Sequence, residues 1–558
     1  MSMRKSTPVV LLATAALTMS ACAQSDREDS GSGDSGGDSA ATDATFTFGA
    51  AGAPEVFDPF YASDGETFRV TRQMFEGLVE VKPGSAEIGP GLAEKWEPSE
   101  DGKTWTFTLR EGVKFTDGEE FNAEAVCANF ERMADQNETA QAGPAEYWAY
   151  SMEGFGDDSL YRSCKATDAK TVELKISRAT SKFPAMLSLS AFAMQSPKAL
   201  ESGDANNVKK QGEGFAYPKN AQEPVGTGPY TLEKYDTANS TVTLKRNDEY
   251  WGEKAKNAEI VFKIIPDEST RRQELEAGSI NGYDLPNPVD WKGLEDSGNT
   301  VEVRPAFNIL YVGLNPEKNT KLKDLKVRQA LSMAVDRENL VTSQLPEGAV
   351  AASQFMPDTV KGYNSELQPM KKDVEGARRL LKEAGAEGME LTFAYPSEVT
   401  RPYMPNPQKI HEAIRRDFEA VGIKVKVVTK PWNGGYLDGV DNGQFDAWLL
   451  GWTGDYDSAD NFIGTFFGNL KSNDFHTSAT DFGSDLSKEL KEADQTVDEA
   501  ERTTMYEELN KKIAEEYIPG LPISHSPPAL VVGEGVEGLT ASPLTAEQFD
   551  TVTVEGGK

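Results

Sequence analysis

Two short segments contain the residues best suited to bind a small charged molecule. Arg401 and Tyr403 lie in the Thr-Arg-Pro-Tyr-Met-Pro sequence that begins at Thr400. The prolines restrict its backbone and so hold both side chains at a low entropic cost. A fixed guanidinium can bind a carboxylate through two parallel hydrogen bonds. Trp452 and Asp455 lie in a Gly-Trp-Thr-Gly-Asp sequence, which offers an aromatic surface and an anion.

Each of these segments follows a predicted strand. Leu391–Tyr395 alternates in polarity, and Ala447–Trp452 is an apolar run, both of which indicate strands. Loops at strand ends are where α/β proteins bind ligands. One cation and one anion on neighbouring loops would suit a zwitterion such as a dipeptide, whose termini lie about 7 Å apart. By spacing alone, Arg401 and Asp455 could equally form a surface ion pair or be unrelated loop charges.

Motifs for catalysis or metal binding are incomplete. His411 begins an H-E-x-x-H zinc sequence, but Arg415 stands where the second histidine is required. The acidic run from Asp455 has Asp460 and Phe466 where a calcium loop needs glycine and glutamate. There is no phosphate-binding P-loop. The sequence therefore predicts a protein that is not an enzyme and has no cofactor and no metal site.

Short strands and helices alternate along the chain, which predicts a mixed α/β fold. Thr104–Leu109 alternates between two Asp-Gly turn signals and indicates a strand of a β-meander. Asn122–Arg132 has a helical apolar period and an Asn cap. Further strands are expected at 241–245, 260–265, 310–314 and 424–428, and further helices at 269–277, 327–335, 373–384, 408–421 and 498–517.

The N-terminus has the features of an export signal. A basic start and a short apolar run, Val9–Met19, precede the small pair before Cys22. This pattern predicts a signal peptide over residues 1–21, with Cys22 as the lipid attachment site. The run is too short to span a membrane. The protein is then extracytoplasmic and held by its lipid at the outer face of the cell membrane, and cleavage without lipidation is the alternative.

Residues 22–45 contain mainly serine, glycine, aspartate and alanine, which predicts a disordered spacer after the lipid. The net charge of −33 argues against nucleic-acid binding, which needs basic surfaces. Two cysteines remain, Cys127 and Cys164. In an oxidising compartment we expect them to form a disulfide, with two buried free thiols as the alternative.

A series of motifs along nearly the whole chain resembles the extracytoplasmic solute-binding proteins of ABC peptide importers (solute-binding protein family 5), and the dipeptide-binding branch in particular. Arg401–Asn406 and Gly451–Asp455 resemble segments of that branch. The other matching segments are Phe75–Val79, Gly91–Trp96, Asp101–Phe115, Gly226–Tyr230, Tyr250–Gly252 and Val327–Leu331.

The resemblance implies a bilobal periplasmic-binding-protein-like fold of the large type II variant, with an extra subdomain. Residues 46–305 plus 523–558 would form lobe I, with two subdomains, and residues 306–522 would form lobe II. Hinge strands would join them, and a dipeptide or short peptide would bind in the cleft and be delivered to an ABC permease. The protein is expected to be a monomer.

Roles of single residues also follow from the resemblance. Arg401 would bind the α-carboxylate of the peptide and Asp455 its α-ammonium group, with Tyr403 and Trp452 shaping the pocket. Ser63 and Asp64 would contribute from lobe I, although that segment matches loosely. The sequence departs from the branch at Ser458-Ala459, where an Asp-Pro pair is usual, which puts side-chain selectivity in doubt.

Other interpretations remain open at this point. The same fold and transport role could serve an oligopeptide, haem, glutathione, aminolevulinate or a nickel complex. An extracytoplasmic hydrolase, and a sensor or adhesin that never meets a permease, are different classes of function. Four aromatic residues in the matching segments are expected to pack in the core or between subdomains rather than to touch ligand: Trp96, Trp105, Tyr250 and Trp251.

Overall fold

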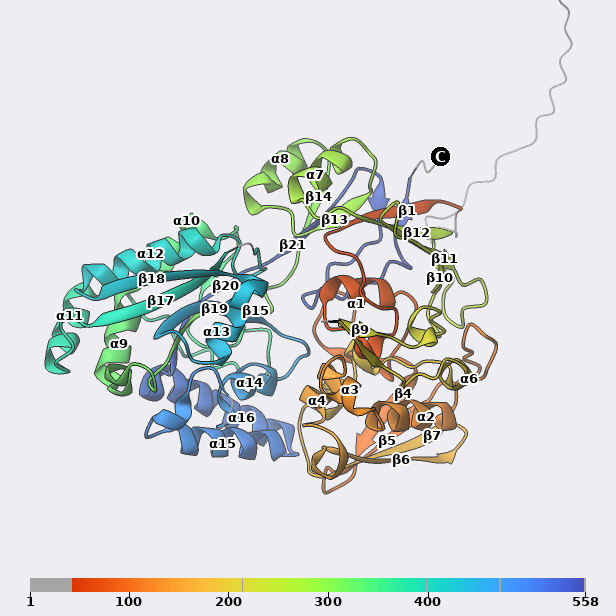
Figure 1. Ribbon diagram of the computed structural model, residues 1–558, viewed down its shortest axis with the longest axis horizontal. Coiled ribbons are helices and arrows are strands. Elements are labelled where there is room, and N and C mark those ends of the chain that lie inside the picture. The colour runs from red at the N-terminus through yellow and green to blue at the C-terminus, as the bar shows by residue number, and fades with distance from the viewer. Residues whose placement is uncertain (1–42, 213, 398, 471–472, 556–558) are drawn as a thin grey trace, which may run out of the picture. The chain divides into compact units, whose positions relative to one another are not determined.

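A computed structural model describes residues 43–212, 214–397, 399–470 and 473–555, and Figure 1 shows its helices and strands. The expected signal peptide 1–21, Cys22 and nearly all of the spacer 22–45 lie outside these residues. Thr45 is the first residue of strand β1 (Thr45–Ala50) and therefore belongs to a sheet rather than to the spacer. Within the described residues, no helix has both the length and the apolar character to cross a membrane.

Lobe I contains a seven-stranded sheet assembled from distant segments. β1 runs parallel to β12 (Glu259–Ile264) on one side and to β13 (Gly282–Asp284) on the other. The carboxyl ends of these three strands therefore lie at one edge of the sheet. β21 (Ala529–Val532) comes from the end of the chain and pairs with β13. The outer strands are β10 (Tyr230–Asp236), β11 (Thr241–Arg246) and β14 (Thr300–Val303).

The extra subdomain of lobe I is a four-stranded antiparallel sheet with helix α2 (Ala123–Ala134) beside it. The expected strand is confirmed as β5 (Thr104–Leu109). The Oδ1 atom of Asn122 accepts a hydrogen bond from the Ala125 N–H at 3.0 Å, so the expected cap is confirmed as well. The other strands are β4 (Ala93–Pro98), β6 (Tyr161–Asp168) and β7 (Thr171–Ile176). In the structure, a disulfide joins Cys127 of α2 to Cys164 of β6.

Lobe II is built on a six-stranded sheet (Figure 1). β15 (Asn308–Leu314) pairs antiparallel with β19 (Ala447–Thr453) and with β20 (Gly520–His525). β17 (Glu390–Ser397) runs parallel to β19 and to β18 (Lys424–Pro431). The short edge strand is β16 (Val350–Ala351), and the main helices are α9 (Leu325–Ala334), α11 (Val374–Glu383), α12 (Pro407–Ala420), α15 (Gly483–Gln495) and α16 (Glu499–Lys511).

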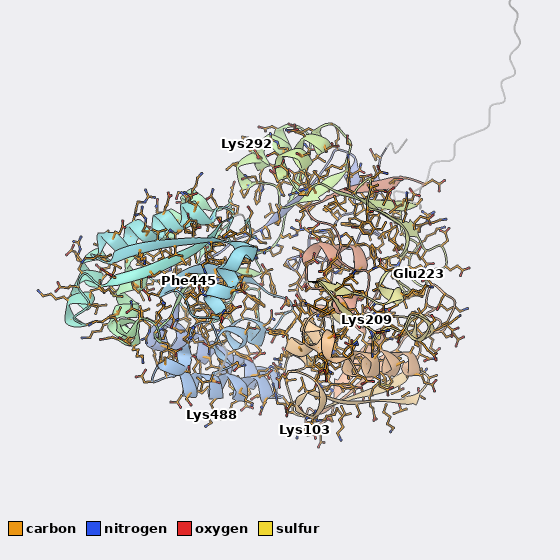
Figure 2. All side chains as sticks on the ribbon, in the orientation of Figure 1. Lys103, Lys209, Glu223, Lys292, Phe445 and Lys488 are labelled. Carbon is orange, nitrogen blue, oxygen red and sulfur yellow. A yellow bond between two sulfur atoms is a disulfide. The ribbon has the colours of Figure 1, made fainter. Side chains whose placement is uncertain are left out.

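The interior of lobe II is apolar and closely packed. Phe445 is buried, whereas Lys488 of α15 is exposed (Figure 2). The buried indole of Trp448 packs over Gly313 of the neighbouring strand, where a Cβ atom would lie 2.1 Å from the indole carbon Cε2. Glycine at this position thus makes room for the tryptophan, which no larger residue could do without displacing it.

The helix expected over residues 498–517 is present, but its hydrogen-bond spacing changes in the last turns. The carboxylate of Asp498 caps α16 by accepting from the Glu501 N–H at 2.9 Å. Lys512–Tyr517 then continues with the wider spacing of a π-helix. Ile518 has a φ of 45°, a left-handed conformation that ends the helical run two residues before β20.

The chain from Ala41 onward groups as one compact unit, and it crosses between the lobes through residues 304–307 and 526–528. Asn308 joins the two crossings, because its side-chain amide donates to the Ser526 carbonyl at 2.7 Å and accepts from the Ser526 N–H at 3.1 Å. Since β20 belongs to the lobe II sheet, that lobe extends to His525 and not to residue 522 as expected. The expected boundary at 305/306 lies within the first crossing.

A buried ion cluster anchors the first crossing in lobe I. The guanidinium of Arg304, which is 0% exposed, donates to Asp284 at 2.6 Å and to Glu547 at 2.7 Å. Arg69 also binds Asp284. Burial alone would raise the pKa of the Asp284 carboxyl, but Arg304 and Arg69 lower it to about 2. Charges in a low dielectric interact strongly, so this cluster holds Arg304 firmly to lobe I. The flexible part of the first crossing therefore begins after Arg304.

Candidate ligand-binding site

The two segments predicted to bind ligand lie at one edge of the lobe II sheet. β17 and β19 are parallel neighbours, so the loops that follow Ser397 and Thr453 leave the sheet on the same side. Tyr403 of the first loop packs directly on Gly451 of β19. A Cβ atom at Gly451 would lie 2.4 Å from the ring carbon Cδ2 of Tyr403. The absence of a side chain at Gly451 therefore allows the two segments to touch.

Arg401 is positioned by its own loop and by an aromatic ring. Its N–H donates to the Met404 carbonyl at 3.2 Å, and the Met404 N–H donates back at 2.9 Å, which closes a tight turn. Its guanidinium carbon lies 4.4 Å from the ring centroid of Trp432, an attractive cation–π arrangement. Among the described residues, no carboxylate forms an ion pair with Arg401. Its hydrogen-bond donors are therefore available to an anionic group.

Tyr403 and Trp452 supply the apolar part of this edge. Burial raises the pKa of the Tyr403 phenol to about 12, despite the opposing charge of Arg401, so the hydroxyl stays neutral. Trp452 lies at the end of β19, with its ring edge-on to Phe466 at 6.4 Å. Its indole N–H is buried and has no acceptor among the described residues. A buried N–H normally has a partner, so Trp452 can donate to a ligand.

The Asp455 carboxylate is held by hydrogen bonds but not by a basic side chain. Its backbone N–H donates to the Asn461 side-chain oxygen at 2.7 Å, and the Asn461 amide donates to its carboxylate at 3.3 Å. Burial raises the pKa of the Asp455 carboxyl to about 6, and only the Asn461 hydrogen bond opposes this effect. No basic residue in the described part of the chain forms an ion pair with it. An ammonium group would supply the missing counter-charge.

Lobe I faces Asp455 with two tyrosines of α4 (Glu146–Ser151). Burial raises the pKa of Tyr147 well above its usual range, and the negative charge of Asp455 adds to this effect. The same two causes, burial first, raise the pKa of Tyr150. The ring of Tyr147 packs edge-on against Phe68 of helix α1 (Gly65–Thr71) at 5.4 Å. The two tyrosines thus form an aromatic wall of lobe I within electrostatic range of the Asp455 carboxylate.

Of the two lobe I residues predicted from the resemblance, Asp64 lies near this wall. Its negative charge also raises the pKa of Tyr147. Its carboxylate caps α1, accepting from the N–H groups of Glu66 at 2.9 Å and Thr67 at 3.0 Å and from the Thr67 hydroxyl at 2.5 Å. These bonds give Asp64 a structural task at the start of α1, and its role toward a ligand stays a prediction. Ser63 is exposed and precedes the cap.

Arg401 also lines a pocket between the lobes, with a volume of about 360 Å³. Its lobe I side includes residues that follow the carboxyl ends of β1, β12 and β13, namely Ala51, Pro266 and Leu285, together with Glu268 and Arg271 of α7 (Glu268–Glu276). Trp291 and the hinge residue Pro527 close it. A pocket of this size is in the range of small-molecule sites. Asp455 is not among its lining residues, so the structure places Arg401 and Asp455 at one edge of the sheet but not in a common pocket.

Comparison with known proteins identifies the family. Residues 87–474 match the model of the bacterial extracellular solute-binding proteins, family 5. The chain belongs to this family. It is 34% identical to the dipeptide-binding protein of Escherichia coli over 530 residues, 92% of this chain and 95% of that protein. It is 30% identical to heme-binding protein A of Haemophilus influenzae, over 98% of each chain.

Solved structures agree with this assignment. The dipeptide-binding protein of a Pseudoalteromonas species, in complex with Met-Leu, superposes with a TM-score of 0.75 and 27% identity, covering 92% of this chain and all of that one. The bilobal α/β fold of the family 5 solute-binding proteins is therefore confirmed here. The family and the relatives are named as binding proteins, which supports a role other than catalysis. No cluster of three metal-ligating side chains occurs in the described residues.

Sequence reasoning missed several residues that the family 5 fold brings to this edge. Trp432 lies beneath Arg401, although 31 positions separate them. Tyr147 and Tyr150 come from the other lobe, and only the aromatic run Tyr-Trp-Ala-Tyr gave any sign of them. Asn461 holds the Asp455 loop by two hydrogen bonds.

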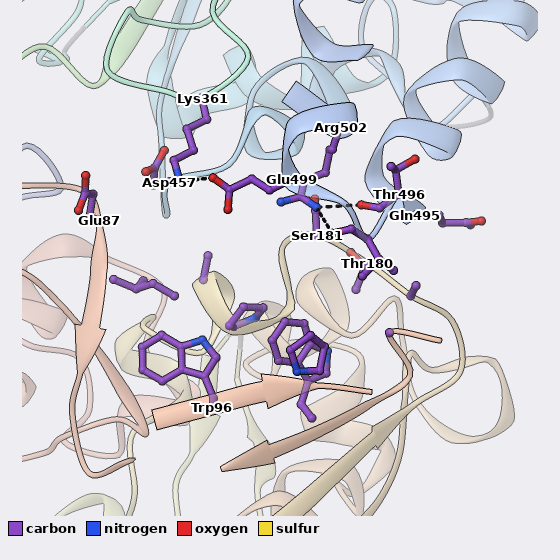
Figure 3. A pocket seen from close by; sticks show the side chains of 18 of the residues that line it. Glu87, Trp96, Thr180, Ser181, Lys361, Asp457, Gln495, Thr496, Glu499 and Arg502 are labelled. Carbon is purple, nitrogen blue, oxygen red and sulfur yellow. Dashed lines mark hydrogen bonds and ion pairs between the residues drawn. The ribbon is translucent and has the colours of Figure 1, made fainter. Parts of the chain in front are cut away.

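The four aromatic residues expected to serve packing do pack. Tyr250 and Trp251 donate to the buried Glu76 carboxylate at 2.7 and 2.9 Å. Trp96 and Trp105 pack against the core of the extra subdomain. In addition, both line a second pocket between the lobes, of about 520 Å³ (Figure 3). Trp96 and Trp105 therefore do more than pack in the core, because they also line this pocket.

Proposed function

We propose that this protein is the extracytoplasmic binding component of an ABC importer for dipeptides or other short peptides. It captures the peptide between its lobes and delivers it to the permease, while a lipid on Cys22 holds it at the outer face of the cell membrane. The observation that supports this proposal most is a cation and an anion, Arg401 and Asp455, that both lack an ion partner among the described residues and lie at one edge of the lobe II sheet.

The two charges have complementary tasks in this proposal. Arg401 binds the α-carboxylate through its guanidinium fork, and the ring of Trp432 holds that fork in place. Asp455 binds the α-ammonium group of the peptide, with Asn461 orienting the carboxylate. Tyr403 and Trp452 form the apolar surface between them. A free zwitterionic peptide satisfies both charges at once.

Closure of the lobes completes the binding. The crossings at 304–307 and 526–528 act as the hinge, a motion typical of proteins that close around a ligand. Closure brings Tyr147 of lobe I against Asp455 of lobe II. Removing water from the two charged contacts strengthens them. The peptide would thus stabilise the closed form.

A second candidate keeps the fold and the transport role but changes the solute to an oligopeptide, haem, glutathione or a nickel complex. The family includes a heme-binding protein at 30% identity. The unpaired Arg401 and Asp455 favour a free peptide over haem, which has carboxylates for Arg401 but no ammonium group for Asp455.

Isothermal titration calorimetry distinguishes these solutes. The protein is unfolded and refolded to remove carried solute, then titrated with Ala-Leu, its N-acetyl and C-amide derivatives, a tetrapeptide and haem. We expect micromolar or tighter binding of Ala-Leu and much weaker binding of both blocked derivatives. Binding of the tetrapeptide or of haem in place of Ala-Leu would assign the second candidate, and equal affinity for the blocked peptides would refute the roles given to Arg401 and Asp455.

A further inference from the structure

Besides the candidate site, the lobes meet at a second place, where the segment Arg178–Lys182 of lobe I contacts lobe II. It follows strand β7 and reaches two aspartates that lie about 280 and 310 positions further along the chain, Asp460 and Asp494. Neither aspartate is assigned to peptide binding. We call the contacts of 178–182 with Asp460 and Asp494 the rim contact.

Asp494 receives most of these contacts. The guanidinium of Arg178 pairs with its carboxylate at 2.8 Å. The other carboxylate oxygen accepts from the Thr180 hydroxyl at 2.7 Å and from the Ser181 hydroxyl at 3.0 Å. The side chain of Asp494 is only 3% exposed. Burial by itself would raise the pKa of this carboxyl, but Lys182 and Arg178 lower it, so it stays charged.

The remaining part of the rim contact is an ion pair, and a neighbouring hydrogen bond between the lobes extends it. The ammonium group of Lys182 pairs with Asp460 at 2.9 Å, with both side chains largely buried. The hydroxyls of Tyr150 and Thr465 lie 2.7 Å apart in a hydrogen bond. Tyr150 belongs to the wall that faces Asp455, so the rim contact continues directly into the candidate site.

The rim contact is bounded by open space on both sides. One side is the 520 Å³ pocket of Figure 3, in which Trp96 lies opposite Lys361 and Glu499, with Thr180 and Ser181 at its edge. The other side is a pocket of about 780 Å³ lined by Tyr150, among other residues. The closed lobes therefore touch here through a small set of charged and polar groups that can separate together.

We propose that the rim contact is a latch that stabilises the closed form and sets how long the solute is retained before release. The physical reason is that its ion pairs exist only while the lobes are together, because opening separates each aspartate from its partners. The rim contact thus stabilises only the closed form. An interaction present in one form only shifts the equilibrium between the open and closed forms. Its effect on peptide release rests on the proposed function, whereas its effect on closure does not.

The latch can be tested with Asp494→Ala. Truncating one partner of a buried, hydrogen-bonded charge pair typically accelerates dissociation, here by about 30-fold or more. Stopped-flow release of a fluorescent dipeptide measures this rate, and single-molecule energy transfer between dyes on the two lobes measures the closed fraction with and without peptide. We expect faster release, a smaller closed fraction and an unchanged ranking of peptides.

Two further variants complete the experiment. Lys182→Met keeps most of the side-chain packing, removes the ion pair with Asp460, and should act in the same direction if Asp494→Ala fails to fold. Glu111→Ala removes an exposed ion pair with Lys170 within lobe I, at 2.7 Å, and should change neither quantity. The proposal would be overturned if a folded latch variant had the same closed fraction and the same release rate as the wild type. If no peptide binds the wild type, the proposed function fails, and the closed fraction alone decides the latch.

Discussion

If Asp455 binds the ammonium group of a peptide as proposed, its protonation should link the affinity for peptide to pH. Burial raises the pKa of this carboxyl to about 6, so the free protein changes charge there between pH 7 and pH 5. Only the ionised form attracts an ammonium group, and protons therefore compete with the peptide. We expect the affinity for a dipeptide with a free amino group to fall as the pH is lowered through 6.

The size of the effect follows from that pKa. With a pKa of about 6, the carboxyl is protonated in about one molecule in eleven at pH 7 and in about ten in eleven at pH 5. The association constant should therefore fall about tenfold over these two pH units. In Asp455→Asn the pH dependence should disappear. Its affinity at pH 7 should be about 30-fold below wild type (about 2 kcal/mol), the lower end of the range for a broken charge pair, because Asp455 is only half-buried.

Calorimetry of Ala-Leu binding at pH 5, 6 and 7 measures both quantities. The amino and carboxyl groups of the peptide keep their charges across most of this range. Asp457→Asn is the matched control, because burial likewise raises the pKa of the Asp457 carboxyl to about 6, but this residue lines the 520 Å³ pocket. The control should retain the tenfold dependence. A wild-type affinity that does not change with pH, or the same dependence in Asp455→Asn, would refute the reasoning.

Three other predictions concern separate parts of the chain. Arg401→Ala should weaken dipeptide binding by about 30-fold or more in calorimetry while leaving the affinity for a C-terminal amide unchanged, and equal losses for acid and amide would contradict the carboxylate role. Mass spectrometry of alkylated, unreduced protein should find Cys127 and Cys164 unmodified, because the structure joins them, and two alkylated cysteines would show free thiols. Radiolabelled palmitate should label the wild type in cells but not Cys22→Ala, and label on the variant would place the lipid elsewhere.

The local elements were predictable from sequence because their causes are local. The strand Thr104–Leu109 follows from alternating residues, and the start of α2 follows from the Asn122 cap. Each depends on residues within a few positions of one another. The change to π-helical spacing over Lys512–Tyr517, just before the chain turns into β20 of the lobe II sheet, has no such local signal.

The sequence by itself determined which residues are candidates for binding the ligand. Arg401 and Asp455 stand out because each lies in a loop that follows a strand, and the ordered motifs indicated the family. Tertiary structure alone decided what surrounds them. Strand pairing and packing bring Trp432 to Arg401 and Tyr147 to Asp455. These partners are tens to hundreds of residues apart, and no local pattern specifies a contact that depends on how two sheets and two lobes fit together.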